Sequence, residues 1–193
     1  MAKAKGKRKT EKYGLSRYFL LTMLLSLLGW AFETAYMRVA TGRWLDRGFM
    51  TLPFCPIYGC TLVFVYFLAG TPQNGRFLLS RVNNAFLRYA LYFLIAFLVP
   101  SVMELLVGLL FDKTLHLRLW TYGDNALNVG GYVCLRNSLI WAVLILLFMR
   151  FLFPFFKRLI GVFPKFLARI LAFALLIVLL ADVSYNIAST VYR

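Results

Sequence analysis

The chain has 193 residues, of which 62% are hydrophobic, and its formal net charge is +15. A soluble domain of this size would need far more polar surface, so the composition excludes that class and indicates an all-α integral membrane protein. The basic residues cluster between apolar runs and form no aromatic–basic platform. This pattern argues against nucleic acid as a partner and for membrane lipids.

Residues 1–16 form a basic segment, which we expect to remain as a cytoplasmic tail, and residues 17–193 form a single integral membrane domain. Five apolar segments are long enough, or nearly so, for a helix that crosses the bilayer. They cover residues of about 17–39, 53–70, 89–111, 131–149 and 166–190.

Two stretches are expected to depart from a simple membrane helix. The second segment is the shortest and begins with Pro53 and Pro56, which fix the first turn of a helix. Residues 151–166, between the fourth and fifth segments, read as an interfacial stretch that Pro154 and Pro164 interrupt.

Lysine and arginine are distributed unequally between the two sides of the membrane. The tail holds seven, the second-to-third loop three and the fourth-to-fifth connection five, against seven on the other side. Because cytoplasmic loops carry the excess of basic residues, the count predicts a cytoplasmic N-terminus and an external C-terminus in the cell membrane.

Four ionisable residues interrupt the apolar segments: Glu33, Glu104, Arg136 and Asp182. The three acids lie seven or eight residues from the outer end of their helices, about 10–12 Å below the boundary. Small and polar residues recur beside each acid at helical spacing, as Ser26 and Gly29 do before Glu33. We therefore expect Glu33 to face inward, toward Glu104, Arg136 and Asp182.

Two interpretations of these charges stay open. They can form a structural ion-pair cluster that fixes how the helices dock. Alternatively, they can line an outward-facing polar pocket, because one arginine cannot neutralise three acids and ionisable residues in a membrane commonly mark functional sites.

The two outer loops repeat one order of features. Each follows a helix that contains a glutamate, carries arginine, tryptophan and glycine, and leads through a cysteine into the next apolar segment. The order predicts a two-helix internal repeat with both copies in the same orientation. Cys55 and Cys134 occupy matching places, and we expect both to be reduced. The expected pocket residues are Glu33, Tyr36, Arg43, Trp44, Arg47, Tyr58, Glu104, Trp120, Tyr122, Asn128, Arg136 and Asp182.

Several of these blocks, in the same order, carry a resemblance. The residues concerned form three blocks: GWAFETAY (residues 29–36), LPFCPIYG (residues 52–59) and a longer block that runs from ELLVG to YVCLRNSLIW. Together they resemble a family of small bacterial multi-pass proteins labelled "putative ABC transporter permease, type IV, CmpB-like". Tyr122-Gly123-Asp124 stands where the family often has Asp-Tyr-Ser. The resemblance implies a role in transport.

Motifs for other chemistry are absent from the sequence. The sequence contains no Gly-x4-Gly-Lys-Ser/Thr loop, which is the motif that binds ATP in P-loop proteins, so an ATPase would be a separate subunit. No metal or cofactor motif appears: the single histidine, His116, has Asp112 and Asp124 near it in sequence but no second histidine, so no metal site is expected. The leading hypothesis is a permease that works as a homo-oligomer or with partner chains. An intramembrane acid–base enzyme, a lipid-binding protein and a structural assembly factor are the alternatives.

Overall fold

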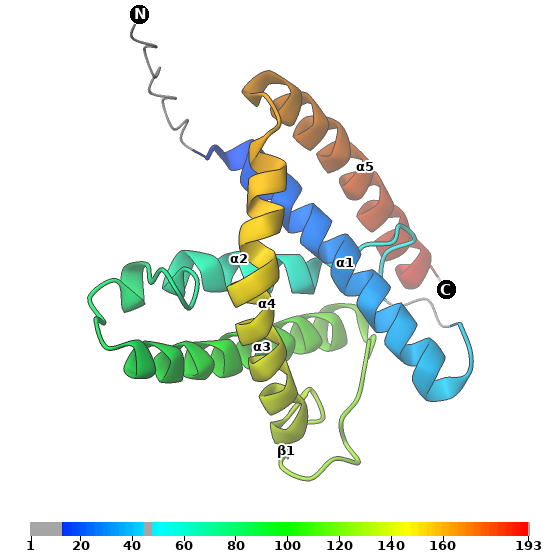
Figure 1. Cartoon of the computed structure of the whole chain (residues 1–193). Helices are drawn as coiled ribbons and strands as arrows, with labels where there is room; N and C mark the ends of the chain where they lie inside the picture. The colour runs from blue at the N-terminus through cyan, green and yellow to red at the C-terminus, as the bar shows by residue number, and fades with distance from the viewer. Residues whose placement is uncertain (1–12, 45–47, 193) are drawn as a thin grey trace, which may run out of the picture.

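The computed structural model describes residues 13–44 and 48–192, and α-helices dominate this part of the chain (Figure 1). The helices are α1 (Leu15–Thr41), α2 (Pro56–Ala69), α3 (Ala85–Leu115), α4 (Leu135–Gly161) and α5 (Lys165–Val191). A 3-10 turn, η1 (Phe77–Leu79), precedes α3, and two short antiparallel strands, β1 (Asn128–Val129) and β2 (Val133–Cys134), precede α4. The expected all-α membrane architecture is confirmed, whereas most of the expected tail, residues 1–12, lies outside the described residues.

Each expected apolar segment corresponds to one helix, but their lengths differ. Four of the helices, α1, α3, α4 and α5, are long and apolar enough to cross a membrane. Helix α2 has only 14 residues and is therefore about 21 Å long, against about 30 Å for the hydrocarbon layer. Its N-terminus lies beside the middle of α1, where the Cys55 N–H donates to the Ser26 carbonyl at 3.2 Å.

The helices alternate in direction, so their connections gather at two ends of the molecule (Figure 1). At one end, which we call the basic end, lie the start of α1, the α2–α3 connection and the α4–α5 turn. Arg17 Nη2 donates to the Phe163 carbonyl at 2.7 Å and thereby ties the α4–α5 turn to α1. The two longer loops, residues 42–55 and 116–134, lie at the opposite end, which we call the loop end.

Helix α4 continues twelve residues beyond its expected end and includes Pro154 without a break. A proline inside a helix has no N–H for the carbonyl four residues earlier, which here belongs to Arg150. The side chain of Gln73, from the α2–α3 connection, donates to that Arg150 carbonyl at 2.6 Å. The sequence predicted an interruption at Pro154. That prediction was wrong because the compensating contact comes from a distant segment, which the local sequence does not reveal.

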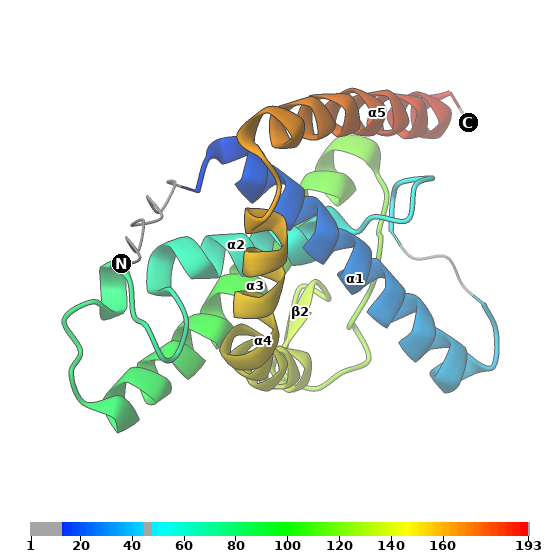
Figure 2. The ribbon, with the colours of Figure 1, turned by 45° about the horizontal axis from the view of Figure 1, so that its top comes forward.

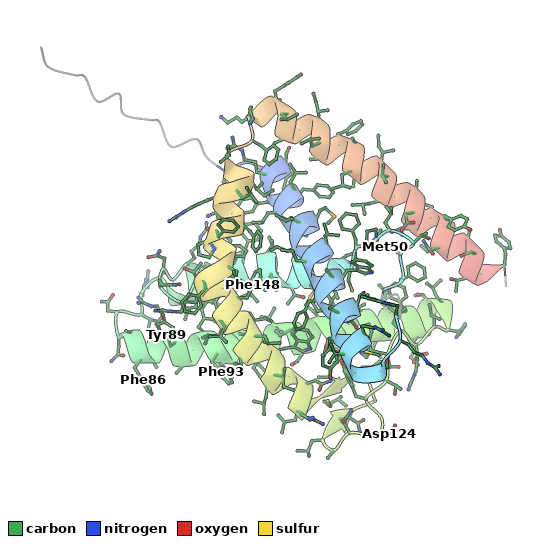
Figure 3. The ribbon with its side chains drawn as sticks, turned by 45° about the vertical axis from the view of Figure 1, so that its right-hand side comes forward. Met50, Phe86, Tyr89, Phe93, Asp124 and Phe148 are labelled. Atoms are coloured by element: carbon green, nitrogen blue, oxygen red, sulfur yellow. The ribbon has the colours of Figure 1, made fainter. Side chains whose placement is uncertain are left out.

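The main core lies between α1, α2, α3 and α4, and α5 packs mainly on the outside of α1 (Figure 2). Fully buried side chains such as Leu25, Val65 and Met149 fill it. A smaller cluster joins Met23 of α1 to Leu179 of α5 through Met50, which Figure 3 labels. Most of the remaining large apolar side chains point outward, as expected for a surface that faces lipid.

The two cysteines that matched in sequence also match in structural position. Cys55 is the N-cap residue of α2, and Cys134 is the N-cap residue of α4. In both cases the helix packs extensively against the preceding long helix, which carries a glutamate. This equivalence agrees with the expected repeat, although the symmetry that relates the two copies stays a prediction.

Candidate functional site

The first element of the site is a hydrogen bond between α1 and α2. Tyr58 Oη donates to Glu33 Oε2 at 2.8 Å. Glycines make this contact reachable, because a Cβ at Gly29 would lie 2.5 Å from the Tyr58 side chain and one at Gly59 would lie 2.0 Å from the Thr22 carbonyl. The small residues of the α1 stripe therefore bring the tyrosine against the glutamate.

The second element is Glu104, in the middle of α3. Tyr122 Oη lies 3.5 Å from Glu104 Oε1, which is a long hydrogen bond. Glu104 Oε2 is buried and has no hydrogen-bond partner among the described residues. The charge of Glu33 is close enough to act on Glu104 electrostatically. Acids from two different helices thus share one region of the fold.

Two residues of α4 complete this group and were not among the expected site residues. Trp141 lies beside Glu104, and its ring centroid is 5.4 Å from that of Tyr58. Asn137 lies beside Tyr122. A helical stripe of Asn137, Ser138 and Trp141 was visible in the sequence and could have indicated this face. We call Glu33, Tyr58, Glu104, Tyr122, Asn137 and Trp141 the glutamate site.

The loop of residues 116–134 holds Tyr122 in position. The Tyr122 N–H donates to the Gly131 carbonyl at 2.8 Å, and the Asn128 side chain accepts from the Gly131 N–H at 3.0 Å. Gly131 adopts a φ of 76°, which favours glycine. Burial raises the pKa of Tyr122 to about 12, so this phenol stays a hydrogen-bond donor at neutral pH.

The same loop is anchored to the end of α3. Trp120 Nε1 donates to the Tyr132 carbonyl at 2.9 Å, and the Tyr132 hydroxyl donates to Asp112. The Tyr132 ring lies against Gly108, where a Cβ would come within 2.7 Å of it. Arg118 pairs with Asp112 at 3.2 Å. The expected pocket residue Trp120 therefore supports the loop through Tyr132, and its indole N–H does not bond to either glutamate.

The other expected site residues lie elsewhere. Arg136 is exposed and forms no ion pair with Glu33 or Glu104. Asp182 accepts hydrogen bonds from the Thr51 N–H at 3.1 Å and the Leu52 N–H at 3.4 Å, so it anchors the α1–α2 loop to α5. Three further residues, Tyr36, Arg43 and Trp44, are exposed on or after the outer part of α1, and Arg47 lies outside the described residues.

The chemistry available to the glutamate site is that of a hydrogen-bond acceptor with a negative charge and aromatic walls. Within residues 13–44 and 48–192, no cluster of three or more His, Cys, Asp or Glu side chains is arranged to hold a metal ion. Two neighbouring carboxylates and the rings of Tyr58, Tyr122 and Trp141 are instead suited to a cationic group, through charge-assisted hydrogen bonds and cation–π contacts.

Comparison with known proteins places the chain in a family. No curated protein and no solved structure matches it. Residues 20–187, however, match a family described as "Putative ABC-transporter type IV". This match covers all five helices except the first turn of α1 and the last turn of α5, together with every residue of the glutamate site. With its long apolar helices, the chain is a multi-pass membrane protein that belongs to this ABC-transporter family.

Proposed function

We propose that this protein is a permease component of an ABC transporter, and that the glutamate site binds a positively charged group of the substrate from the loop end. The observation that carries the proposal is the buried Oε2 of Glu104, which forms no hydrogen bond of normal length and angle among the described residues, although the neighbouring Trp141 side chain can act as a donor to this carboxyl group. A buried carboxylate oxygen that lacks a partner costs about 1–3 kcal/mol or more. A cationic group that donates a hydrogen bond would remove this cost.

The charge balance supports the same conclusion. Glu33 and Glu104 influence one another, and Arg136 is too exposed to serve as their shared counterion. A carboxylate buried beside a second acid, as Glu104 is, is costly unless a proton or a cation lies close to it. A purely structural ion-pair cluster would need a basic partner for Glu104, and within residues 13–44 and 48–192 no basic residue forms a hydrogen bond or an ion pair with its Oε2.

The energy source would reside in a separate polypeptide. The sequence contains no ATP-binding loop, whereas the family is one of ABC transporters. We therefore propose a separate ATPase subunit as the partner, with the basic end of this chain facing it in the cytoplasm. The chain would act in the cell membrane as a homo-oligomer, because five helices are few for a transport pathway.

Binding of a cation can be measured through Trp141 in the full-length protein held in lipid nanodiscs. Butylammonium and spermidine serve as probes with one and several positive charges, and both can donate hydrogen bonds. We expect at least one of them to change the tryptophan fluorescence of the wild type, and the change should vanish in Trp141→Phe. Glu33→Gln and Glu104→Gln should each weaken binding about tenfold or more, because a charge-assisted hydrogen bond contributes about 1.5–3 kcal/mol.

The matched control is Asp124→Asn, which removes the same charge from an exposed position on the same loop end. Its affinity should equal that of the wild type. If it weakens binding as much as Glu104→Gln does, attraction to the overall charge explains the result and the site is refuted. Unchanged binding in both glutamate variants would refute it equally, and loss of folded protein in Glu33→Gln would favour a structural role.

A further inference from the structure

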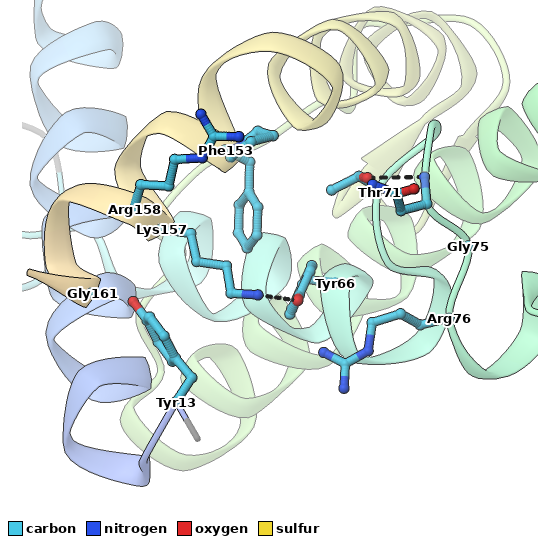
Figure 4. A pocket seen from close by; sticks show the side chains of 11 residues that line it. Tyr13, Tyr66, Thr71, Gly75, Arg76, Phe153, Lys157, Arg158 and Gly161 are labelled. Carbon is cyan, nitrogen blue, oxygen red and sulfur yellow. Dashed lines mark hydrogen bonds between the residues drawn. The ribbon is translucent and has the colours of Figure 1, made fainter. Parts of the chain in front are cut away.

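The basic end contains a cavity that the glutamate site does not involve. Its volume is about 430 Å³, and it lies between the start of α1, the end of α2, the α2–α3 connection and the end of α4 (Figure 4). The polar side chains that matter for its chemistry are Tyr13, Tyr66, Arg76, Lys157 and Arg158. The volume suits a small polar ligand or a lipid headgroup.

The charge of this cavity is one-sided. Three of its lining residues are basic and none is acidic. The five described acids, Glu33, Glu104, Asp112, Asp124 and Asp182, lie elsewhere, on the loop-end halves of the helices or in the loops there. Among the described residues, therefore, no carboxylate neutralises the basic groups of the cavity.

Aromatic rings hold two of these cations close together. Lys157 Nζ lies 4.4 Å from the centroid of the Tyr66 ring and donates to the Tyr66 hydroxyl, as Figure 4 shows. The Arg76 guanidinium lies 4.9 Å from the same centroid. Cation–π contacts offset part of the mutual repulsion of two cations, but they do not neutralise the charge. An anion between them would do so.

A hydrogen-bond donor in the cavity also lacks a partner. The Tyr13 hydroxyl is buried and forms no hydrogen bond within the described part of the chain. Burial raises the pKa of Tyr13, so the phenol keeps its proton and can donate it in a hydrogen bond. The Tyr13 ring also lies 5.4 Å from Lys157 Nζ. The cavity is therefore lined both by a cationic group and by a tyrosine whose hydroxyl has no partner among the described residues.

We propose that this cavity binds an anionic phosphate group, either that of a membrane lipid or that of a soluble phosphate compound. Arginine forks and a lysine ammonium are the groups that proteins commonly use for phosphate, and a phenol adds a neutral donor. Arg158, in the last turn of α4, would also complement the dipole of that helix. That role predicts an effect on stability alone, whereas the proposed role predicts binding.

The test uses the full-length protein in nanodiscs and has two arms. In the first, inorganic phosphate is added at constant ionic strength to discs of phosphatidylcholine. In the second, phosphatidylglycerol replaces part of the phosphatidylcholine. The readout in both is the thermal unfolding midpoint as a function of ligand concentration. Protection in the first arm identifies a soluble source, protection only in the second identifies a lipid, and protection in neither overturns the proposal.

Three variants separate a defined site from diffuse attraction. Arg76→Gln should weaken the apparent affinity about tenfold, since it removes one charge-assisted contact. Arg81→Gln is the matched control, an exposed arginine of the same connection that does not line the cavity, and its affinity should not change. Equal effects of the two substitutions would overturn the proposal.

The third variant, Tyr13→Phe, tests whether a loss of ligand protection comes from a lost contact and not from a loss of folded protein. Because the hydroxyl has no partner, its removal should leave the midpoint without ligand unchanged or slightly higher. The protection by ligand should nevertheless decrease severalfold. If Tyr13→Phe binds as the wild type does, the unpaired phenol is not part of a phosphate site and the proposal fails. Failure here leaves the glutamate site untouched, because the two lie at opposite ends of the molecule.

Discussion

Gly59→Ala tests the contact between α1 and α2 on which the glutamate site depends. A Cβ at this position would lie 2.0 Å from the Thr22 carbonyl oxygen and 2.3 Å from Ser26 Oγ. The Thr22 oxygen is backbone and cannot rotate away, so the two helices must separate by about 1.5 Å to restore ordinary contact distances. The neighbouring Tyr58 would then move away from Glu33.

The expected loss of stability follows from two opposing effects. Overpacking a tight interface costs about 1–3 kcal/mol. Replacing glycine by alanine within a helix returns up to about 1 kcal/mol. With the full gain subtracted, the net destabilisation should be about 0–2 kcal/mol, and it should lie toward the upper end because the clash is with backbone. The matched control is Gly161→Ala in α4, where the nearest atom would be 3.6 Å away, so that this variant should be neutral or slightly stabilised.

Unfolding in mixed micelles, followed by circular dichroism, measures both variants against the wild type. A cation that binds at the glutamate site should also bind more weakly to Gly59→Ala than to Gly161→Ala. If Gly59→Ala proves as stable as Gly161→Ala, the helices do not approach as closely as described. The placement of Tyr58 against Glu33 would then be refuted as well.

Three further outcomes are expected. Asp182→Ala should destabilise the protein by about 1 kcal/mol and speed proteolysis of the α1–α2 loop, because the Thr51 and Leu52 N–H groups lose their acceptor. Asp182→Asn should retain part of the contact. Equal rates of proteolysis in the wild type and both variants would contradict this role of Asp182. Because the pKa of Tyr122 is raised in the folded state, its contribution to stability should be complete below pH 10 and be lost as the pH rises toward 12. Stability should therefore decline less steeply over this range in Tyr122→Phe than in the wild type. If the two plots of stability against pH are parallel, burial of Tyr122 does not cause the decline. Reporter fusions should place the C-terminus outside the cell and the α2–α3 connection in the cytoplasm, and a cytoplasmic C-terminus would refute the five-helix crossing order.

The sequence predicted those parts of the fold that depend on local patterns. Apolar runs located the five helices, and the small residues of α1, Ser26 and Gly29, indicated an inward face for Glu33, although not that this face packs against α2. Contacts between distant segments were beyond such reasoning. Pro154 remains within α4 because Gln73 satisfies the exposed carbonyl, and no pattern near Pro154 reveals that donor.

The grouping of four charges by depth shows a second limit. Depth along a helix says nothing about the direction in which a side chain points. The buried face of α4 includes Ser138 and Ala142, and Arg136 lies two residues from Ser138, which is about 200° around the helix. Asp182 has a similar depth, but α5 packs on the outside of α1 and directs this carboxylate to the loop. Angular position would have excluded Arg136 and would have selected Trp141.

The shortness of α2 has a consequence for the surrounding bilayer. A helix of about 21 Å leaves a hydrophobic mismatch of nearly a third of the hydrocarbon thickness on its side of the protein. The membrane must thin there, or water and headgroups must descend to the level at which α2 begins. Tyr58 lies in the first turn of α2 and holds Glu33 at that level. The exposure of Glu33 and Glu104 to water is thus expected to increase in thinner membranes and to decrease in thicker ones.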